Sequence, residues 1–134
     1  MTQEQKDLLL KDLCGRLPYG VEFRYKYINN FFHEDYATSK LEGVLPPYHI
    51  MHSTLVGEDY LNIEDDEVRP YLFPLLSMTE EQRKEFNTTL KYLPAEEIDI
   101  WTRDTYDWCD KNHFDYRGLI PMGLANNATG LNIY

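Results

Sequence analysis

Apolar residues recur at helical spacing at the start of the chain and alternate strictly just after it. In residues 2–17 the apolar positions lie three and four residues apart, which predicts an amphipathic helix. These positions are Leu9, Leu10, Leu13, Cys14 and Leu17. Thr2 followed by Gln5 predicts a capping box at the start of this helix, and Gly15 with Pro18 predicts its end.

Residues 21–27 alternate between apolar and charged side chains, which predicts a half-buried antiparallel strand. Val21, Phe23, Tyr25 and Tyr27 fall on one side, and Glu22, Arg24 and Lys26 fall on the other. Between Phe31 and Leu76, turn residues divide short β-prone runs, which predicts a curled meander of four or five short strands. Pro70 and Pro74 restrict the last run to an edge strand or an irregular extended segment.

Two further helices are expected in the second half of the chain. Thr79 with Gln82 predicts another capping box, opening a helix that stops before Pro94. The third helix should begin near Asp104, with Trp108 and Cys109 facing the core. Residues 126–134 are polar and glycine-containing, so we expect a loose tail, with Tyr134 as a candidate anchor for its end.

These elements predict one α+β domain that spans residues 1–134, a length typical of single domains. Its parts are a helix (1–17), a β-rich part (18–76), a helical part (77–125) and the loose tail (126–134). The expected architecture is an N-terminal helix, a small curved antiparallel sheet or partly open barrel of four to five strands, and two C-terminal helices. The apolar content of 43% is sufficient for a packed core.

The charge distribution narrows the classes of partner. The formal net charge is -10, and residues 45–67 hold six acidic residues and no basic one. Such a field repels nucleic acids and anionic membranes, and favours a protein partner with a basic surface. No apolar run is long enough to span a bilayer, and two cysteines without Cys-x-x-Cys spacing suit a reducing compartment, so we expect a cytoplasmic protein. The oligomeric state is left open.

No catalytic residue, metal or cofactor is predicted. The glycine spacings at 15–20 and 118–123 resemble phosphate loops but lack the following lysine and hydroxyl residue. The pairs Cys109 with His113 and His49 with His52 have spacings that metal sites use, yet such spacings are common by chance. Asp104, Asp107 and Asp110 are interpreted as helix-terminal and surface charges.

Two short motifs are candidate binding residues. The acidic run Glu64, Asp65, Asp66 and Glu67 lacks the spacing of a calcium loop, and is either a solvated loop or a docking patch for a basic partner. Phe31 and Phe32 are adjacent, so a regular strand cannot bury both rings. Either one ring is exposed, or a bulge or a loop covers the core with them.

Three segments resemble a family of short acidic proteins from gut bacteria and their prophages or other mobile elements. These segments are LLLKDLCGRLPYGV (8–21), PYLFPLLSMTEE (70–81) and HFDYRGLIPMGLA (113–125). The activity of that family is unknown, so the resemblance implies only a context, that of a mobile-element accessory protein.

The first hypothesis is therefore a non-enzymatic binding or regulatory protein, a mobile-element or prophage accessory that acts through protein contacts. An alternative is an enzyme with an unrecognised polar site near His33, Glu34, His49 and His52. A third reading is an acidic mimic of nucleic acid, or a nucleic-acid binder on the barrel face; the latter would use Tyr25, Tyr27, Arg24 and Lys26.

Overall fold

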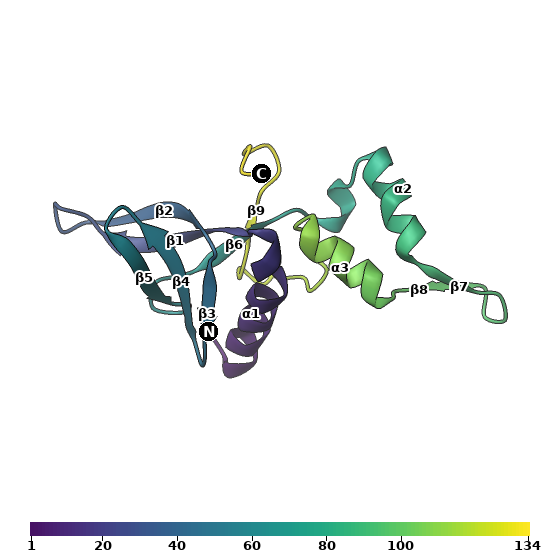
Figure 1. The fold of residues 1–134 in the computed structure, drawn as a ribbon, viewed down its shortest axis with the longest axis horizontal. Coiled ribbons are helices and arrows are strands. Elements are labelled where there is room, and N and C mark those ends of the chain that lie inside the picture. The colour runs from purple at the N-terminus through teal and green to yellow at the C-terminus, as the bar shows by residue number, and fades with distance from the viewer.

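The structure is a computed structural model that describes residues 1–134, and its fold is α+β (Figure 1). The helices are α1 (Gln3–Arg16), α2 (Glu80–Thr89) and α3 (Arg103–Lys111), with 3-10 turns η1 (Leu17–Tyr19) and η2 (Leu75–Ser77). The strands are β1 (Glu22–Ile28), β2 (Glu34–Lys40), β3 (Gly43–Leu45), β4 (His49–Thr54), β5 (Gly57–Asn62), β6 (Arg69–Leu72), β7 (Lys91–Leu93), β8 (Ile98–Ile100) and β9 (Asn126–Asn127). No helix combines the length and apolar composition needed to cross a membrane.

The predicted helices begin where their capping boxes are. The Thr2 hydroxyl accepts a hydrogen bond from the backbone N–H of Gln5, and the Gln5 side chain accepts one from the Thr2 N–H. Thr79 and Gln82 form the same reciprocal pair at α2. Residues 1–6 (MTQEQK) and 78–83 (MTEEQR) are similar hexapeptides because the chain uses the same local capping solution twice.

The strands form three separate sheets instead of one meander. β2, β1, β6 and β9 form a four-stranded sheet, β3, β4 and β5 form a second, and β7 pairs with β8 in a ribbon. All pairs are antiparallel except β6 with β9. No strand carries hydrogen bonds from one sheet to the next, so the sheets do not close into a barrel. Residues 18–76 hold six strands, one more than the largest number expected.

Strand β6 lies inside the four-stranded sheet, so the expectation of an edge or irregular segment there is wrong. Phe23 of β1 is opposite Pro70, in the first half of β6. Tyr71, in the second half, is opposite Asn126 of β9. Because its neighbours are offset along β6, Pro70 does not have to donate a hydrogen bond on both sides.

The C-terminal tail is held against the sheet, which corrects the expectation that residues 126–134 are loose. The N–H of Ala128 donates to the carbonyl of Leu72 at 2.8 Å, and Ala128 is buried. The hydroxyl of Tyr134 donates to the carbonyl of Tyr71 at 2.7 Å and accepts from the N–H of Glu22 at 2.9 Å. Tyr134 is thus the anchor that the sequence offered, whereas the bond of Ala128 to Leu72 was not expected.

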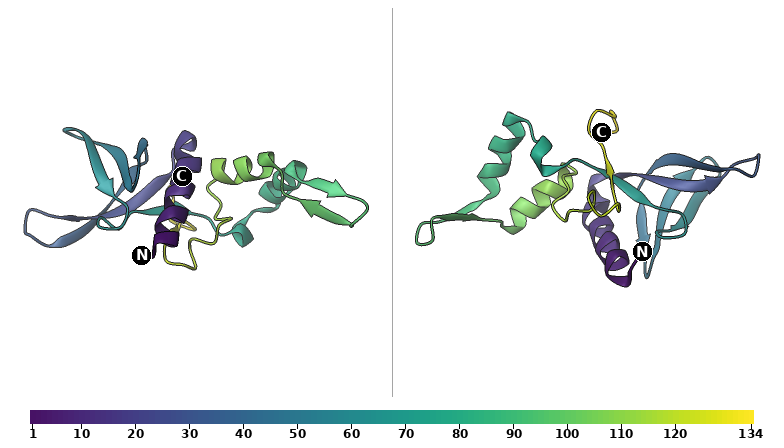
Figure 2. Two further views of the ribbon diagram at one scale, coloured as in Figure 1. Left: turned by 90° about the horizontal axis from the view of Figure 1, so that it is seen from below. Right: turned by 180° about the vertical axis from the view of Figure 1, so that it is seen from behind.

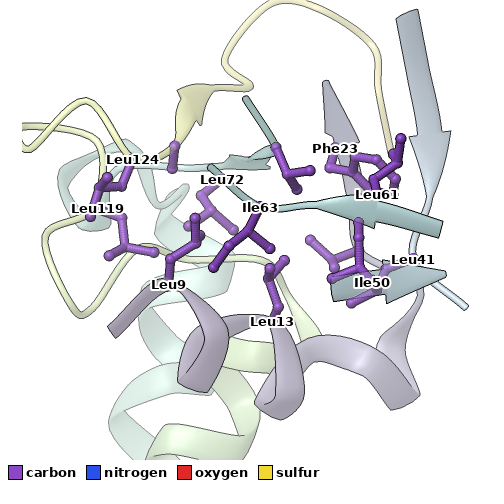
Figure 3. Packing of buried hydrophobic residues seen from close by; sticks show 13 residues of the cluster. Leu9, Leu13, Phe23, Leu41, Ile50, Leu61, Ile63, Leu72, Leu119 and Leu124 are labelled. Carbon is purple, nitrogen blue, oxygen red and sulfur yellow. The ribbon is translucent and has the colours of Figure 1, made fainter. Parts of the chain in front are cut away.

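The main core lies between α1, the two larger sheets and the chain that follows α3. Figure 3 shows Leu9 of α1 close to Leu119 and Leu13 close to Ile63, with Phe23 and Ile50 on the side nearest the sheets. A smaller cluster between α2 and α3 is built from Phe86, Cys109 and Phe114. Trp108, expected to be buried, is half-buried and stacks on Phe114 with ring centres 5.4 Å apart.

Helix α1 buries most of the predicted face, and with it two charged residues that were not expected in the core. Leu9 and Leu13 are buried as expected, but Cys14 is exposed, and Asp12 and Arg16 are fully buried. Arg16 Nε donates to Asp12 Oδ2 at 2.9 Å. Apolar spacing alone could not indicate this face, because its charged residues are paired inside the protein.

The partners of this pair come from the far end of the chain. Arg117 Nη1 donates to Asp12 Oδ1 at 2.7 Å, and the carboxylate of Asp110 lies 3.9 Å from both Arg16 Nε and Arg117 Nη1. Burial raises the pKa of Asp110, while Arg16 opposes the shift. We call Asp12, Arg16, Asp110 and Arg117 the buried ionic cluster; it joins α1 to α3.

Candidate functional site

Strands β1 and β2 form a long hairpin that extends from the body of the molecule. Its register runs from Glu22 opposite Lys40 to Ile28 opposite Glu34. Val21 and Phe23 are buried, Tyr25 is half-buried and Tyr27 is exposed, so the predicted core-facing side leaves the core gradually toward the turn.

The turn of this hairpin directs two phenylalanines into solvent. The Asn29 side-chain oxygen accepts hydrogen bonds from the N–H groups of Phe31 and His33, at 2.9 and 3.1 Å. Phe31 and Phe32 are 80% and 89% exposed. Phe32 also has a φ of 60°, the left-handed region that bulky residues avoid. Both rings point outward, so neither a bulge nor a loop over the core accounts for them.

The hairpin of β4 and β5 ends in a second apolar pair. Thr54 is opposite Gly57, which leaves Leu55 and Val56 in the turn. The Thr54 hydroxyl holds this turn by donating to the Gly57 carbonyl at 2.8 Å. Leu55 and Val56 are both fully exposed. The sequence did not reveal this pair, because two apolar residues after a β-prone run resemble a continuing strand.

Both turns lie at the same end of the molecule, opposite α2 and the β7–β8 ribbon (Figures 1 and 2). Figure 2 shows the two hairpins diverging toward that end. We call Phe31, Phe32, Leu55 and Val56 the hairpin tips. They are the four most exposed large apolar side chains of the two hairpins.

A row of polar aromatic contacts connects the two hairpins below their tips. The Tyr27 hydroxyl donates to Asp35 at 3.4 Å, and the Tyr27 and Tyr25 ring centres are 6.1 Å apart. Tyr25 meets the His52 ring edge to face at 5.0 Å, and His52 Nε2 lies 3.6 Å from Asp59 Oδ2. We call these five residues the tyrosine strip.

His52, which the sequence offered as one member of a histidine pair and of the alternative polar enzyme site, is the buried centre of this strip. Its side chain is shielded from solvent, and Nδ1 is 2.9 Å from the Ser39 hydroxyl. Nε2 has no hydrogen-bond partner, because 3.6 Å to Asp59 is too long. Burial, and secondarily the charge of Asp59, raise the pKa of Tyr25.

The basic residues of β1 are on the face opposite the strip. The Arg24 guanidinium lies over the Tyr36 ring at 4.6 Å, and Lys26 pairs with Glu34 at 3.7 Å. Alternation along β1 therefore separates Tyr25 and Tyr27 from the nearest positive charges. The strip carries two carboxylates and contains no lysine or arginine.

The acidic run is built into the fold more than a solvated loop would be. Glu64 pairs with Lys6 at 2.6 Å, which lowers the pKa of Glu64 and raises that of Lys6. Asp66 accepts a hydrogen bond from the N–H of Asn62 at 2.7 Å. Glu67 accepts one from the Tyr36 hydroxyl at 3.3 Å, and Asp65 is the exposed member. These side chains therefore attach the run to α1, β2 and β5.

The other candidate residues are dispersed. His33 is exposed in the first turn, and His49 lies on the face of β4 opposite His52. No group of three or more His, Cys, Asp or Glu side chains is placed to hold a metal ion. Burial raises the pKa of Cys109 to about 12 and lowers that of His113 to about 4, which keeps both groups uncharged at neutral pH.

Five surface hollows have volumes between about 210 and 410 Å³ and are lined by four to seven residues each. None of the five is lined by a histidine. The histidines and carboxylates thus do not converge in these hollows. No protein-family model, curated protein or solved structure matches the chain.

Proposed function

We propose that this chain is a non-enzymatic binding or regulatory protein that contacts a partner protein through the hairpin tips. The observation that carries the proposal is the exposure of four large apolar side chains, in two adjacent pairs, at one end of the molecule. Fully burying such a side chain contributes about 1.5–3 kcal/mol. A partner that covers the hairpin tips would therefore gain apolar contacts at two separate points, one on each hairpin.

The backbone of Phe32 supports a role in binding. A left-handed conformation costs a bulky residue about 1–2 kcal/mol, and here no burial of the ring offsets that cost. Strained residues of this kind concentrate at functional sites. Phe32 therefore destabilises the free protein, and it lies at the exposed turn that a partner would contact first.

The charge and the resemblance support a context for this binding. A net charge of -10 favours a basic partner and disfavours nucleic acid. Both cysteines are free thiols, which suits the reducing cytoplasm. The resemblance to short acidic proteins of gut bacteria and their prophages favours an accessory protein of a mobile element.

The test places a photo-crosslinking amino acid at position 32 and exposes the purified protein to extract from the host cell. The control protein carries the same group at Tyr92, an exposed residue on the distant β7–β8 ribbon. We expect one protein to be captured from position 32 and not from position 92, and mass spectrometry identifies it. The binding of this purified partner is then measured directly.

Substituting Phe31→Ser and Phe32→Ser together should weaken that binding at least about tenfold, while the melting temperature does not fall. Tyr92→Ser with Ile98→Ser is the matched control, because it removes two exposed apolar side chains at the other end. Equal binding by the tip variant and the wild type would overturn the proposal. So would an equal loss in the control variant.

A second candidate is catalysis at His52, favoured by one observation. Ser39, His52 and Asp59 lie in series, at 2.9 and 3.6 Å, as a hydroxyl, an imidazole and a carboxylate do in acyl-transfer enzymes. The test is labelling by a fluorophosphonate. Stoichiometric modification of Ser39 that is lost in His52→Gln would support catalysis, and an unmodified Ser39 would exclude it.

A further inference from the structure

We infer that the tyrosine strip is the receptor for an arginine side chain from an extended basic segment of the partner protein. This inference rests on the proposed function and specifies the chemistry of the partner. The strip crosses from β2 and β1 to β4 and β5 below the hairpin tips, so a segment that contacts the tips also passes it.

The strip has the shape and charge that a guanidinium requires. Two carboxylates stand at its ends, Asp35 on β2 and Asp59 on β5, and two tyrosine rings lie between them. Asp59 is more than half exposed, and Asp35 and Tyr27 are exposed. A guanidinium stacks on a tyrosine face within about 6 Å and binds carboxylates through its planar fork.

Charge complementarity selects a cationic occupant. No lysine or arginine belongs to the strip, and the whole segment 45–67, which supplies β4 and β5, has none. The bases of β1 are engaged on its other face, where Arg24 covers Tyr36. An incoming positive charge therefore meets two carboxylates without a competing cation of the chain itself.

The unpartnered nitrogen of His52 is an independent indication of a ligand at this point. Buried polar atoms in folded proteins almost always have a hydrogen-bond partner. His52 Nε2 has none, and it is directed to Asp59 at the exposed end of the strip. Because this nitrogen is itself shielded from solvent, a segment lying along the strip would contact Asp59, the exposed carboxylate beside it.

The experiment uses the whole chain and two synthetic peptides, acetyl-Leu-Gly-Arg-Gly-Leu-amide and its citrulline counterpart, which keeps the shape and lacks the charge. Binding is followed by NMR at the ring signals of Tyr25, Tyr27 and His52. We expect the arginine peptide to cause saturable changes in chemical shift, with a dissociation constant of about 1 mM. This dissociation constant should rise with salt concentration. The citrulline peptide should bind at least about tenfold more weakly.

Variants locate the binding. The double variant Asp35→Asn with Asp59→Asn should bind the arginine peptide at least about tenfold more weakly than the wild type does. Glu96→Gln with Glu97→Gln removes the same charge from the exposed β7–β8 turn and should leave binding unchanged. Equal binding of the two peptides, equal losses in the two variants, or no shift at the strip would overturn the inference.

This result is separable from the test of the proposed function. One outcome is that the crosslinked partner requires Phe31 and Phe32 for binding while the arginine peptide leaves the NMR signals of the strip unchanged. In that case the tips bind a partner and the arginine assignment is wrong. If the partner binds the tip variant normally, the proposed function fails whatever the peptide does.

Discussion

Arg16 and Asp12 form an ion pair 2.9 Å long, one helical turn apart in α1, and neither side chain reaches solvent. The remaining donors of Arg16 reach the carbonyls of Cys109 at 3.3 Å and Phe114 at 2.6 Å. A buried ion pair is tolerated only when its remaining donors and acceptors are satisfied. The pair is therefore a joint between the start of the chain and α3.

Removing one charge of this joint should destabilise the protein strongly. Asp12→Ala leaves the Arg16 guanidinium buried without its carboxylate, and we expect a loss of about 3–5 kcal/mol in the free energy of unfolding. Urea denaturation measures it. Asp107→Ala, at an exposed position of α3, should change stability by less than about 0.5 kcal/mol. Similar values for the two variants would mean that the pair is solvated.

Relieving the backbone of Phe32 should stabilise the protein. Asn tolerates the left-handed region far better than Phe does, so Phe32→Asn should raise the free energy of unfolding by about 1 kcal/mol. Phe31→Asn is the control, because Phe31 does not have a positive φ. Thermal melts of the two variants check the prediction. A gain at position 31 as large as at position 32 would rule out strain as the cause.

Stability should fall in acid through His113. Burial, assisted by Arg16, lowers the pKa of His113 from its ordinary 6.5 to about 4. As the pH falls below 6.5, His113 becomes protonated in the unfolded chain but stays neutral in the folded protein. The free energy of unfolding therefore decreases down to about pH 4.

The variant His113→Asn isolates this contribution from that of the carboxylates, and Asn suits the positive φ of 63° at this position. Urea denaturation at several pH values should give a flatter profile for this variant, even if it is less stable throughout. His33→Gln, at an exposed position, should keep the wild-type profile. An unchanged slope in His113→Asn would show that His113 titrates normally in the fold.

The two thiols should differ in reactivity. Cys14 is exposed, whereas Cys109 is fully buried with a pKa of about 12. At about pH 8, a disulfide reagent should modify only the Cys14 thiol in the folded protein and both thiols in urea. Cys14→Ser should abolish the fast reaction and Cys109→Ser should leave it intact. Fast modification of Cys109 in folded protein would contradict its placement in the core.

Local signals in the sequence predicted the elements well. The capping boxes at Thr2 and Thr79 are confirmed because a cap depends on residues only three positions apart. The alternation of β1 predicted which side chains turn inward at Val21 and Phe23. The α+β class followed from the order of these elements.

Long-range relationships could not be predicted in this way. Asp12 lies outside the apolar stripe of its helix, and one of the two arginines that neutralise it, Arg117, is 105 positions away, so local spacing gave no sign of its burial. His52 and Asp59 meet only because β4 and β5 pair, and the turn that exposes Leu55 and Val56 follows from that same register. The periodicity of apolar residues does not determine which residues face each other on paired strands.

The buried ionic cluster also sets an order of events during synthesis of the chain. Helix α1 leaves the ribosome before α3, and Arg16 can pair with Asp12 as soon as the helix forms. Its remaining donors find their acceptors, the carbonyls of Cys109 and Phe114, only when those residues have emerged. Docking α1 on the sheets before then would bury guanidinium N–H groups without hydrogen-bond partners, which is costly. We therefore expect the attachment of α1 to be a late step, with a long loop to close.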